Sequence, residues 1–342
     1  MKRYDTKAFT QRLPSMIKNL LEKCQNIAIF GHEYIDGDCL WSMLWLGTIL
    51  ENMNKSISYF TPYPVGKSLQ FVTWREKIQT DFDYETYDTL IFLDFNNYSR
   101  IKLFTQWNEE YFNKQNVIII DHHYGDTPIS VPQENILIDV KASSCCEWIY
   151  EHIIQRRPDN ITPDIANYLY LWLTTDTGNF MYEPDSQRTM QNAIWLIQAG
   201  ADKKHILDNI FYRNDPNTIT FSNTLIQRYQ QTKDILRTYY DEKELEEKNI
   251  DKDQADFWFH LLKTIYGPNI YIRIRRSENN LRWSVRGNGK IDCATLCNKL
   301  FDGWGHYNAA WFSIQREEEF SEGINYIIEK IQTYIKNLTA KS

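Results

Sequence analysis

The sequence lacks the features that mark several large classes of protein. Six cysteines in 342 residues, without a Cys-x-x-Cys pair, indicate reduced thiols rather than a disulfide framework. The amino terminus lacks the uninterrupted apolar core of a signal peptide, and no later stretch approaches the length of a membrane span. Basic residues are outnumbered, 38 against 45 acidic ones, which argues against coating of duplex DNA through a general basic surface. We therefore expect a soluble, cytoplasmic protein with no membrane partner.

The length and the apolar segments predict an α/β protein with two domains. A chain of 342 residues can bury two cores, and 42% hydrophobic against 24% charged residues is ordinary for a globular protein. Short apolar runs alternate with helical or irregular stretches; these runs cover residues 26–30, 56–60, 89–95, 116–123 and 135–140. The alternation predicts a parallel sheet flanked by helices.

Polar side chains gather where these predicted strands or their adjoining helices end. They are His32, Asp36 and Asp38 in G-H-E-Y-I-D-G-D, Asp94, the run Asp121, His122 and His123, and Asp176 in T-T-D-T-G-N-F. Ligands bind at the carboxyl ends of strands in open α/β sheets. Several carboxylates and imidazoles, shared through a bridging aspartate, compose a two-metal site for Mn²⁺ or a similar ion. Two such cations suit phosphoester hydrolysis, which requires a hydroxide nucleophile and neutralised phosphoryl oxygens.

Each of these residues also has an ordinary structural explanation. An aspartate at a strand end is usually a turn or cap residue, and adjacent histidines usually belong to the surface or the core. Cys39, which follows Asp38 at the start of an apolar helix, is expected to point into the core rather than to bind metal. The set of four polar loops, each after a predicted strand or its adjoining helix, favours a metal site over four unrelated turns.

The carboxyl-terminal third carries a local basic excess. Strand alternation in I-Y-I-R-I-R-R and L-R-W-S-V-R-G places Arg273 and Arg275 on one face of a hairpin strand, and Arg282, Ser284 and Arg286 on one face of its partner. Between Ile270 and Ala310 there are seven Lys or Arg against three Asp or Glu. This patch predicts an anion-binding surface; the alternative is an ordinary solvated strand face.

Five segments, taken in order, resemble the motifs of the DHH phosphoesterase superfamily: GHEYIDGD, LDFNNYSR, IDHHYGD, LTTDTGNF and GWGHYNAA. The resemblance runs from about Asn26 to Trp311. It is to the subgroup with a DHHA1 domain, which includes nanoRNases and pAp phosphatases, cyclic dinucleotide phosphodiesterases and RecJ exonucleases. It implies a parallel-sheet DHH catalytic domain over residues 1–190, a helical linker over 191–230, and a smaller α/β DHHA1 substrate-binding domain over 231–342.

The resemblance also implies the metal ligands and the cofactor. One metal would be held by His32, Asp36 and Asp94, and the other by Asp38, Asp94, His122 and Asp176. Asp94 would bridge the two ions, and the ion that Asp176 contacts is left open. The cofactor would be two divalent ions, expected to be Mn²⁺, with a bridging hydroxide as nucleophile.

Further roles follow from the same resemblance. His123 would face the substrate phosphate or the hydroxide, Asp121 would orient a neighbouring histidine, and Arg100 would lie near the substrate. Substrate contacts in the second domain would come from Arg282, Arg286, Gly303, Trp304, Gly305 and His306.

The loop D-G-W-G-H departs from the family pattern, in which it is rich in glycine throughout. It is expected to precede a short helix that starts with Ala309 and Ala310, and Trp311 stands there in place of a glycine. Trp304 either packs the domain or offers a stacking surface to a base.

The implied function is Mn-dependent hydrolysis of short nucleotides, namely nanoRNA of two to five nucleotides or 3′-phosphoadenosine 5′-phosphate. The alternatives are a cyclic or linear dinucleotide phosphodiesterase acting on c-di-AMP or pApA, a RecJ-like single-strand exonuclease, and, from a different class, a catalytically silent nucleotide-binding protein. Expected partners are short single-stranded RNA or DNA oligonucleotides and small nucleotides. The sequence leaves open whether the chain forms a homodimer.

Overall fold

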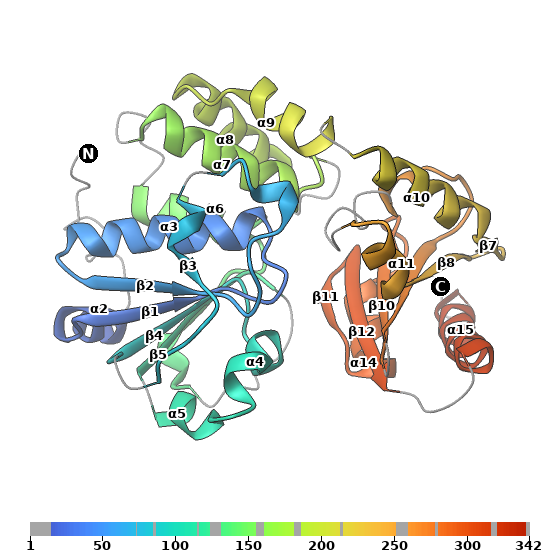
Figure 1. The fold of residues 1–342 in the computed structure, drawn as a ribbon, viewed down its shortest axis with the longest axis horizontal. Helices are drawn as coiled ribbons and strands as arrows, with labels where there is room; N and C mark the ends of the chain where they lie inside the picture. The colour runs from blue at the N-terminus through green and yellow to red at the C-terminus, as the bar shows by residue number, and fades with distance from the viewer. Residues whose placement is uncertain are drawn as a thin grey trace. The chain divides into compact units, whose positions relative to one another are not determined.

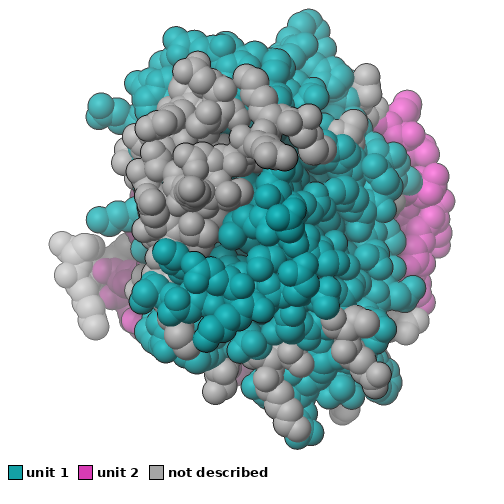
Figure 2. Space-filling view, turned by 90° about the vertical axis from the view of Figure 1, so that its left-hand side faces the viewer, with its two compact units in different colours: residues 1–213 teal, residues 214–342 magenta. Residues whose placement is uncertain are grey.

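The computed structural model describes most of the chain as two compact units. It covers residues 15–72, 74–84, 87–114, 116–123, 131–154, 161–180, 186–212, 215–250, 259–277, 280–315 and 320–339. The first unit is residues 1–213 and the second is residues 214–342 (Figure 2). Within the covered ranges, every helix is too short or too polar to cross a membrane.

The first unit is built on a parallel sheet of six strands, as the sequence predicts. Their order is β3-β2-β1-β4-β5-β6. The strands are β1 (Asn26–Phe30), β2 (Ser56–Phe60), β3 (Ile78–Gln79), β4 (Thr89–Leu93), β5 (Asn116–Asp121) and β6 (Ile136–Ile138). Three of the predicted strands extend two residues beyond the carboxyl ends of the observed ones, and the two-residue β3 was not predicted. The short β3 and β6 close the two edges of the sheet.

Helices cover both faces of this sheet (Figure 1). The longer ones are α2 (Ser15–Lys23), α3 (Gly37–Asn52), α7 (Pro163–Asp176), α8 (Ser186–Gln198) and α9 (Lys203–Phe211); the shorter ones are α4 (Lys102–Thr105), α5 (Glu109–Lys114) and α6 (Cys145–Ile149), which runs into a π-helical turn at Tyr150–Ile154. Single 3-10 turns lie at Lys67–Leu69, Arg75–Lys77, Tyr98–Ile101 and Gln133–Asn135. Ile27 and Ile29 of β1 share a core with α3, α6 and α7, while Ala28 and Phe30 share the other core with α4 and α5.

The second unit has a mixed sheet of six strands. The order is β11-β12-β10-β9-β8-β7, and all neighbours are antiparallel except β8 and β9. The strands are β7 (Gln230–Gln231), β8 (Ile235–Asp241), β9 (Ile270–Arg276), β10 (Asn280–Gly287), β11 (Trp304–His306) and β12 (Ala309–Gln315); the helices are α10 (Pro216–Gln227), α11 (Glu242–Glu247), α13 (Phe259–Leu262), α14 (Cys293–Phe301) and α15 (Phe320–Thr339). One face packs Ile272, Trp283 and Phe312 against α14 and α15.

One sequence expectation differs from the structure here. The short helix expected after Gly305 is wrong, because residues 304–315 form the β11–β12 hairpin. Gly305 has φ +145°, and a Cβ there would lie 2.5 Å from Cα of Ala310, so only glycine permits this close pairing. The stretch predicted to be a helical linker, residues 191–230, holds most of α8 with α9 in the first unit and α10 in the second.

The packing of α3 against β2 yields a stability prediction. A Cβ at Gly47 would collide with the ring of Tyr59, 2.5 Å from its Cζ. Gly47→Ala should therefore lower the free energy of unfolding by about 1–3 kcal/mol, even though alanine favours a helix by about 1 kcal/mol. Urea unfolding of Gly47→Ala, Tyr59→Leu and the double variant measures this. Leucine removes the colliding atoms. The double variant should therefore lose less unfolding free energy than the two single variants lose in total. Equal losses would contradict the steric explanation.

Candidate metal centre

The parallel register brings three of the predicted polar loops, those after β1, β4 and β5, to one edge of the first sheet. Phe30 pairs with Phe60 on one side and Phe92 on the other, so β1, β2 and β4 end at the same level. Asp94 follows β4, and its backbone N–H continues the ladder by donating to the carbonyl of Ile120 at 3.0 Å. The carboxyl ends of β1, β4 and β5 therefore face a common site.

Asp94 lies at the centre of this site. Its Oδ2 is 3.4 Å from Nε2 of His32, and its Oδ1 is 3.2 Å from Nε2 of His122 and 3.6 Å from Nδ1 of His123. The residue is 2% exposed, and its φ of +66° lies in the left-handed region that non-glycine residues rarely adopt. Such strain persists where the surroundings hold a functional side chain in place.

The hydrogen bonds of two histidines define how they face Asp94. Nδ1 of His32 lies 2.7 Å from the carbonyl of Glu33, and Nδ1 of His122 lies 3.3 Å from that of Ala142. A carbonyl only accepts, so each Nδ1 donates to it, and Nε2 faces Asp94, where it either carries a second proton toward the carboxylate or offers its lone pair to a metal ion. A lone pair against a carboxylate oxygen is repulsive unless a cation lies between them. The donor set therefore fits divalent metal ions, which replace the protons otherwise needed there.

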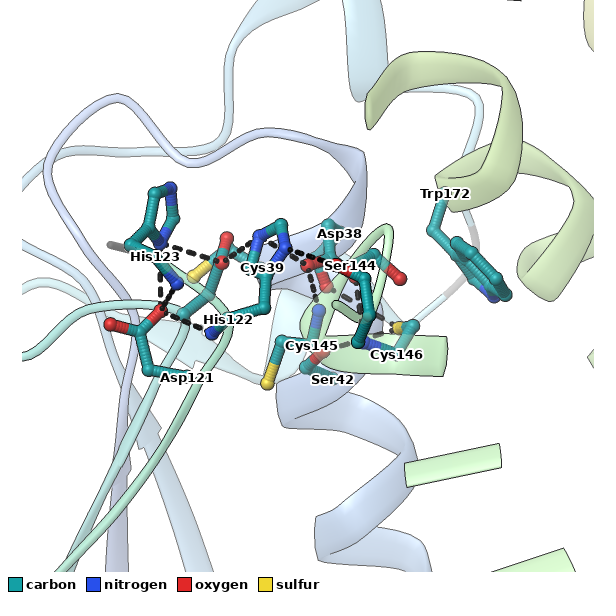
Figure 3. Close-up of polar contacts among 12 residues, drawn as sticks. Asp38, Cys39, Ser42, Asp121, His122, His123, Ser144, Cys145, Cys146 and Trp172 are labelled. Atoms are coloured by element: carbon teal, nitrogen blue, oxygen red, sulfur yellow. Dashed lines mark hydrogen bonds and ion pairs between the residues drawn. The ribbon is translucent and has the colours of Figure 1, made fainter. Parts of the chain in front are cut away.

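Asp38 is held by the amino terminus of α6. Its Oδ2 accepts the N–H of Cys145 at 2.7 Å and its Oδ1 that of Cys146 at 2.8 Å (Figure 3). Oδ2 also lies 3.8 Å from Nε2 of His122. Each carboxylate oxygen keeps a second lone pair, so the clamp orients Asp38 without preventing it from binding a metal.

The local sequence explains why α6 begins where it can hold Asp38. Ser144 is the N-cap residue and accepts the N–H of Glu147 at 2.8 Å. The carboxylate of Glu147 accepts the N–H of Ser143 at 2.7 Å and an N–H of Asn192 on α8 at 2.6 Å. These bonds leave the N–H groups of the first helical residues directed at Asp38.

The two central carboxylates have opposite pKa shifts. Burial, followed by the charge of Asp94, raises the pKa of Asp38 well above its usual value. Burial acts in the same direction on Asp94, but hydrogen bonds from His122 and His32 hold the pKa of Asp94 well below its usual value. A bound cation would favour the ionised form of both groups, which is the form that ligates metals.

Asp121 orients the second histidine of the pair. Its Oδ1 accepts the backbone N–H groups of His122 and His123 at 2.8 and 3.2 Å, and lies 2.7 Å from Nδ1 of His123 (Figure 3). Burial lowers the pKa of the His123 imidazole, and the charge of Asp121 opposes that shift. His123 is therefore a ring held by one buried carboxylate beside Asp94.

Asp36 and Arg100 lie in adjoining loops. Asp36 is the N-cap of α3: its Oδ1 accepts the N–H of Cys39 at 3.0 Å, and its Oδ2 lies 3.8 Å from Nε2 of His32. Arg100 is buried, with Nη1 3.4 Å from Oε1 of Glu33, and its carbonyl accepts the N–H of Glu33 at 2.9 Å. Arg100 thus braces the loop that carries His32.

Sequence reasoning left Cys39 out of the site. Its sulfur belongs to a cluster with donor atoms of His32 and Asp94, all within 4.8 Å of one another. Burial and the charge of Asp94 raise the pKa of the thiol well above its usual value, so it is neutral in this setting. No local signal separates such a thiol from a core cysteine. The side chains of Asp176, the last residue of α7, and of His306 lie outside the part that the structure describes.

In the second unit, the register places the predicted basic residues on one face. Arg275 pairs with Arg282 and Arg273 with Ser284, opposite the face that forms the core. The guanidinium of Arg282 lies 4.4 Å from the ring centroid of Trp311. The Trp311 ring also meets that of Trp304 at 6.4 Å. These contacts make the face both cationic and aromatic.

Three other residues of this unit contribute to its electrostatics and packing. Lys263, after α13, was not predicted; burial and then the charge of Arg286 lower its pKa to about 7. Arg286 donates to the carbonyl of its neighbour Val285 at 3.1 Å. A Cβ at Gly303 would lie 2.5 Å from the carbonyl oxygen of Trp311, so this glycine allows close packing of the hairpin.

Comparisons with known proteins agree with this site. Residues 26–171 match the model of the "DHH family, N-terminal domain". The bifunctional oligoribonuclease and PAP phosphatase NrnA of Mycoplasma genitalium is 24% identical over 92% of this chain and 96% of its own length. NrnA of Bacillus subtilis is also 24% identical, over 86% of this chain and 90% of its own. The cyclic-di-AMP phosphodiesterase PdeA of Listeria monocytogenes is 23% identical over 98% of this chain, which spans 51% of PdeA.

Solved structures share the fold. An exopolyphosphatase-related protein from Bacteroides fragilis superimposes with a TM-score of 0.78 at 19% identity, over 99% of both chains. RecJ of Thermus thermophilus, crystallised with Mn²⁺, gives a TM-score of 0.54 at 12% identity over 97% of this chain and 55% of RecJ. The match to the family and the buried cluster of imidazoles and carboxylates lead to one conclusion: the chain belongs to the DHH family of metal-dependent phosphoesterases.

Proposed function

We propose that this phosphoesterase hydrolyses short nucleotides, such as RNA of two to five nucleotides or 3′-phosphoadenosine 5′-phosphate, with two Mn²⁺ ions. The observation that supports it best is Asp94, whose two carboxylate oxygens each face the Nε2 of a different histidine at 3.4 and 3.2 Å. A carboxylate approached from both sides by metal-ligating atoms is suited to bridge two cations.

The proposed ligands divide into two sets that share Asp94. The first set is His32, Asp36 and Asp94, and the second is Asp38, Asp94, His122 and Asp176. Oxygen and imidazole donors without thiolate suit Mn²⁺, an ion present in one crystal structure of RecJ. When bound, the cations neutralise phosphoryl oxygens and lower the pKa of water.

His123 is proposed to transfer a proton or to hydrogen-bond to the phosphate, and Asp121 is proposed to orient its ring. Asp121 is buried and lies 2.7 Å from Nδ1 of His123, so it holds the proton on that nitrogen. Nε2 is then the atom that exchanges a proton with the substrate or hydrogen-bonds to its phosphate. Arg100, beside the His32 loop, adds positive charge near the phosphate.

The second unit, proposed to be a DHHA1 domain, would recognise the rest of the nucleotide. Arg282 and Arg286 supply charge for phosphate, Lys263 adds to it, and Trp304 and Trp311 offer aromatic surface for a base. A local cationic face on a chain with net charge −7 suits a small anionic substrate better than a long duplex.

The share of each relative's length that the chain matches separates the candidate activities. The NrnA relatives, named for oligoribonuclease and PAP phosphatase activity, match over nearly their whole length, whereas the chain spans about half of PdeA. This difference favours short RNA and 3′-phosphoadenosine 5′-phosphate over cyclic dinucleotides, and c-di-AMP or pApA cleavage is the second candidate.

A substrate panel tests the proposal directly. With Mn²⁺, the chain should hydrolyse 5′-labelled RNA of two to five nucleotides and 3′-phosphoadenosine 5′-phosphate faster than pApA, c-di-AMP or a long single strand. Time courses of product release measure this. Preference for the long strand would instead indicate an exonuclease of the RecJ type, and absence of turnover with every substrate would contradict the proposal.

The role of Asp94 has a matched control at the other end of β4. Asn has the shape of the Asp94 side chain and tolerates the left-handed backbone, but Asp94→Asn should weaken Mn²⁺ binding. Turnover should fall on the order of a thousandfold, since metal ions supply several kcal/mol of transition-state stabilisation. Asp88, before β4, accepts the N–H groups of Gln25 and Asn26 at 2.8 and 3.0 Å. Asp88→Asn should lower the unfolding free energy by about 1 kcal/mol and leave Mn²⁺ binding unchanged. Calorimetric Mn²⁺ titration and urea unfolding compare them; equal Mn²⁺ affinity in Asp94→Asn and wild type would refute the assignment.

The shifted pKa of Lys263 predicts a pH dependence of anion binding. Because the pKa is lowered to about 7, the lysine is charged below that pH and neutral above it. Sulfate, whose charge is constant in this range, should bind about three- to fivefold more weakly at pH 8.5 than at pH 6. Calorimetry in the Asp94→Asn background avoids metal-bound sulfate. Lys263→Met should make sulfate affinity nearly independent of pH, whereas substitution of the exposed Lys290 by Met should not. If Lys263→Met kept the pH dependence of the wild type, Lys263 would have no part in anion binding.

A further inference from the structure

Two tyrosines lie at the edge of the first sheet that carries the metal centre. Tyr34 is in the loop after β1, between His32 and Asp36 in the sequence, and Tyr63 follows β2 by three residues. β1 and β2 end in register, with the N–H of Gly31 bonded to the carbonyl of Phe60 at 2.9 Å. The rings stack with centroids 4.8 Å apart and planes inclined by 8°. An aromatic surface therefore extends from the metal loop toward β2.

Tyr34 occupies a conformation that a large side chain seldom adopts. Its φ is +54°, in the left-handed region where glycine or asparagine carries a smaller cost. A bulky residue there costs on the order of 1 kcal/mol or more. The stack on Tyr63 offsets part of this cost. A tyrosine at this position makes sense if its ring has a use that a glycine could not serve.

Tyr63 is presented by a stiff segment. It stands between Pro62 and Pro64, which restrict the backbone on both sides, and its carbonyl accepts the hydroxyl of the buried Thr61 at 2.7 Å. The side chain nevertheless remains 36% exposed. A rigid, exposed ring loses little entropy when a flat ligand stacks on it.

We propose that the Tyr34–Tyr63 pair is a subsite for the base of the nucleotide whose phosphate lies at the metal centre. This subsite rests on the proposed function, because a base close to the cleaved phosphate is what distinguishes a nucleotide from other phosphoesters. Stacking on an aromatic side chain contributes about 1–3 kcal/mol per base and tolerates any base. The pair thus selects nucleotides over sugar phosphates without selecting sequence.

Equilibrium binding measures the contribution of the base to affinity separately from the hydrolysis reaction. AMP and ribose 5-phosphate share the phosphate and sugar and differ in the base. Calorimetry with Mn²⁺ should show that wild-type protein binds AMP about tenfold more tightly, equivalent to about 1.4 kcal/mol. Tyr63→Ala should remove this preference by weakening AMP alone, and Tyr63→Phe, which keeps the ring, should preserve it. The Mn²⁺ affinity of both variants should match wild type.

A second variant separates recognition from support of the loop. Tyr34→Asn removes the ring and suits the left-handed backbone, so the melting temperature should hold or rise while AMP affinity falls. Equal affinity of wild type for AMP and ribose 5-phosphate would overturn the subsite. Weaker Mn²⁺ binding in Tyr63→Ala would also overturn it, since the pair would then be a brace for the metal loop.

The binding measurement stands apart from turnover. If wild-type protein hydrolysed no nucleotide in the substrate panel, the proposed function would fail, but a base preference that disappears in Tyr63→Ala would still establish the subsite. If turnover were present and the base preference absent, only the subsite would fail.

Discussion

Burying a carboxylate at the edge of a sheet requires positive charge, and this requirement shapes the first unit. Asp94 is 2% exposed and Asp38 is fully buried, so neither is solvated by water. An isolated buried carboxylate would take up a proton rather than remain charged. Three imidazoles around Asp94 and two backbone N–H groups on Asp38 provide partial compensation. Divalent cations complete that compensation, which explains why the cluster belongs to a metal-dependent enzyme.

The two helices next to the cluster use their amino termini for this task in different ways. At α3 the cap residue is the candidate ligand Asp36, so one carboxylate both caps the helix and faces His32. At α6 the cap is Ser144, which leaves the first helical N–H groups for Asp38. Helix amino termini favour negative charge, and here they fix the position of carboxylates before any metal binds. The parallel register of the strands then determines which loops meet, and therefore which ligands can share an ion.

The strands and most candidate ligands could be predicted because their signals are local. A run of β-branched residues such as 117–120 indicates a buried strand, and the polar residues that end it are read directly from the sequence. Cys39, Lys263 and the Tyr34–Tyr63 stack could not be predicted, because each depends on contacts between distant segments. The β11–β12 hairpin was missed since alanines favour a helix, while the pairing depends on the backbone of Gly305. Local propensity was overridden there by tertiary pairing.

The second unit shows the same electrostatic requirement with the opposite sign. Arg273 is 4% exposed, and burial lowers its pKa to about 10, with further lowering by Arg275, Arg286 and Arg282. Like charges held together are destabilising; Oε1 of Glu242 lies 3.1 Å from Nε of Arg275 and balances part of this charge, and a bound anion would balance more. The first unit thus gathers acids and imidazoles suited to cations, and the second gathers basic side chains suited to anions. For the proposed nucleotide hydrolysis, the first arrangement suits the phosphate that is cleaved and the second suits further negative charge on the substrate.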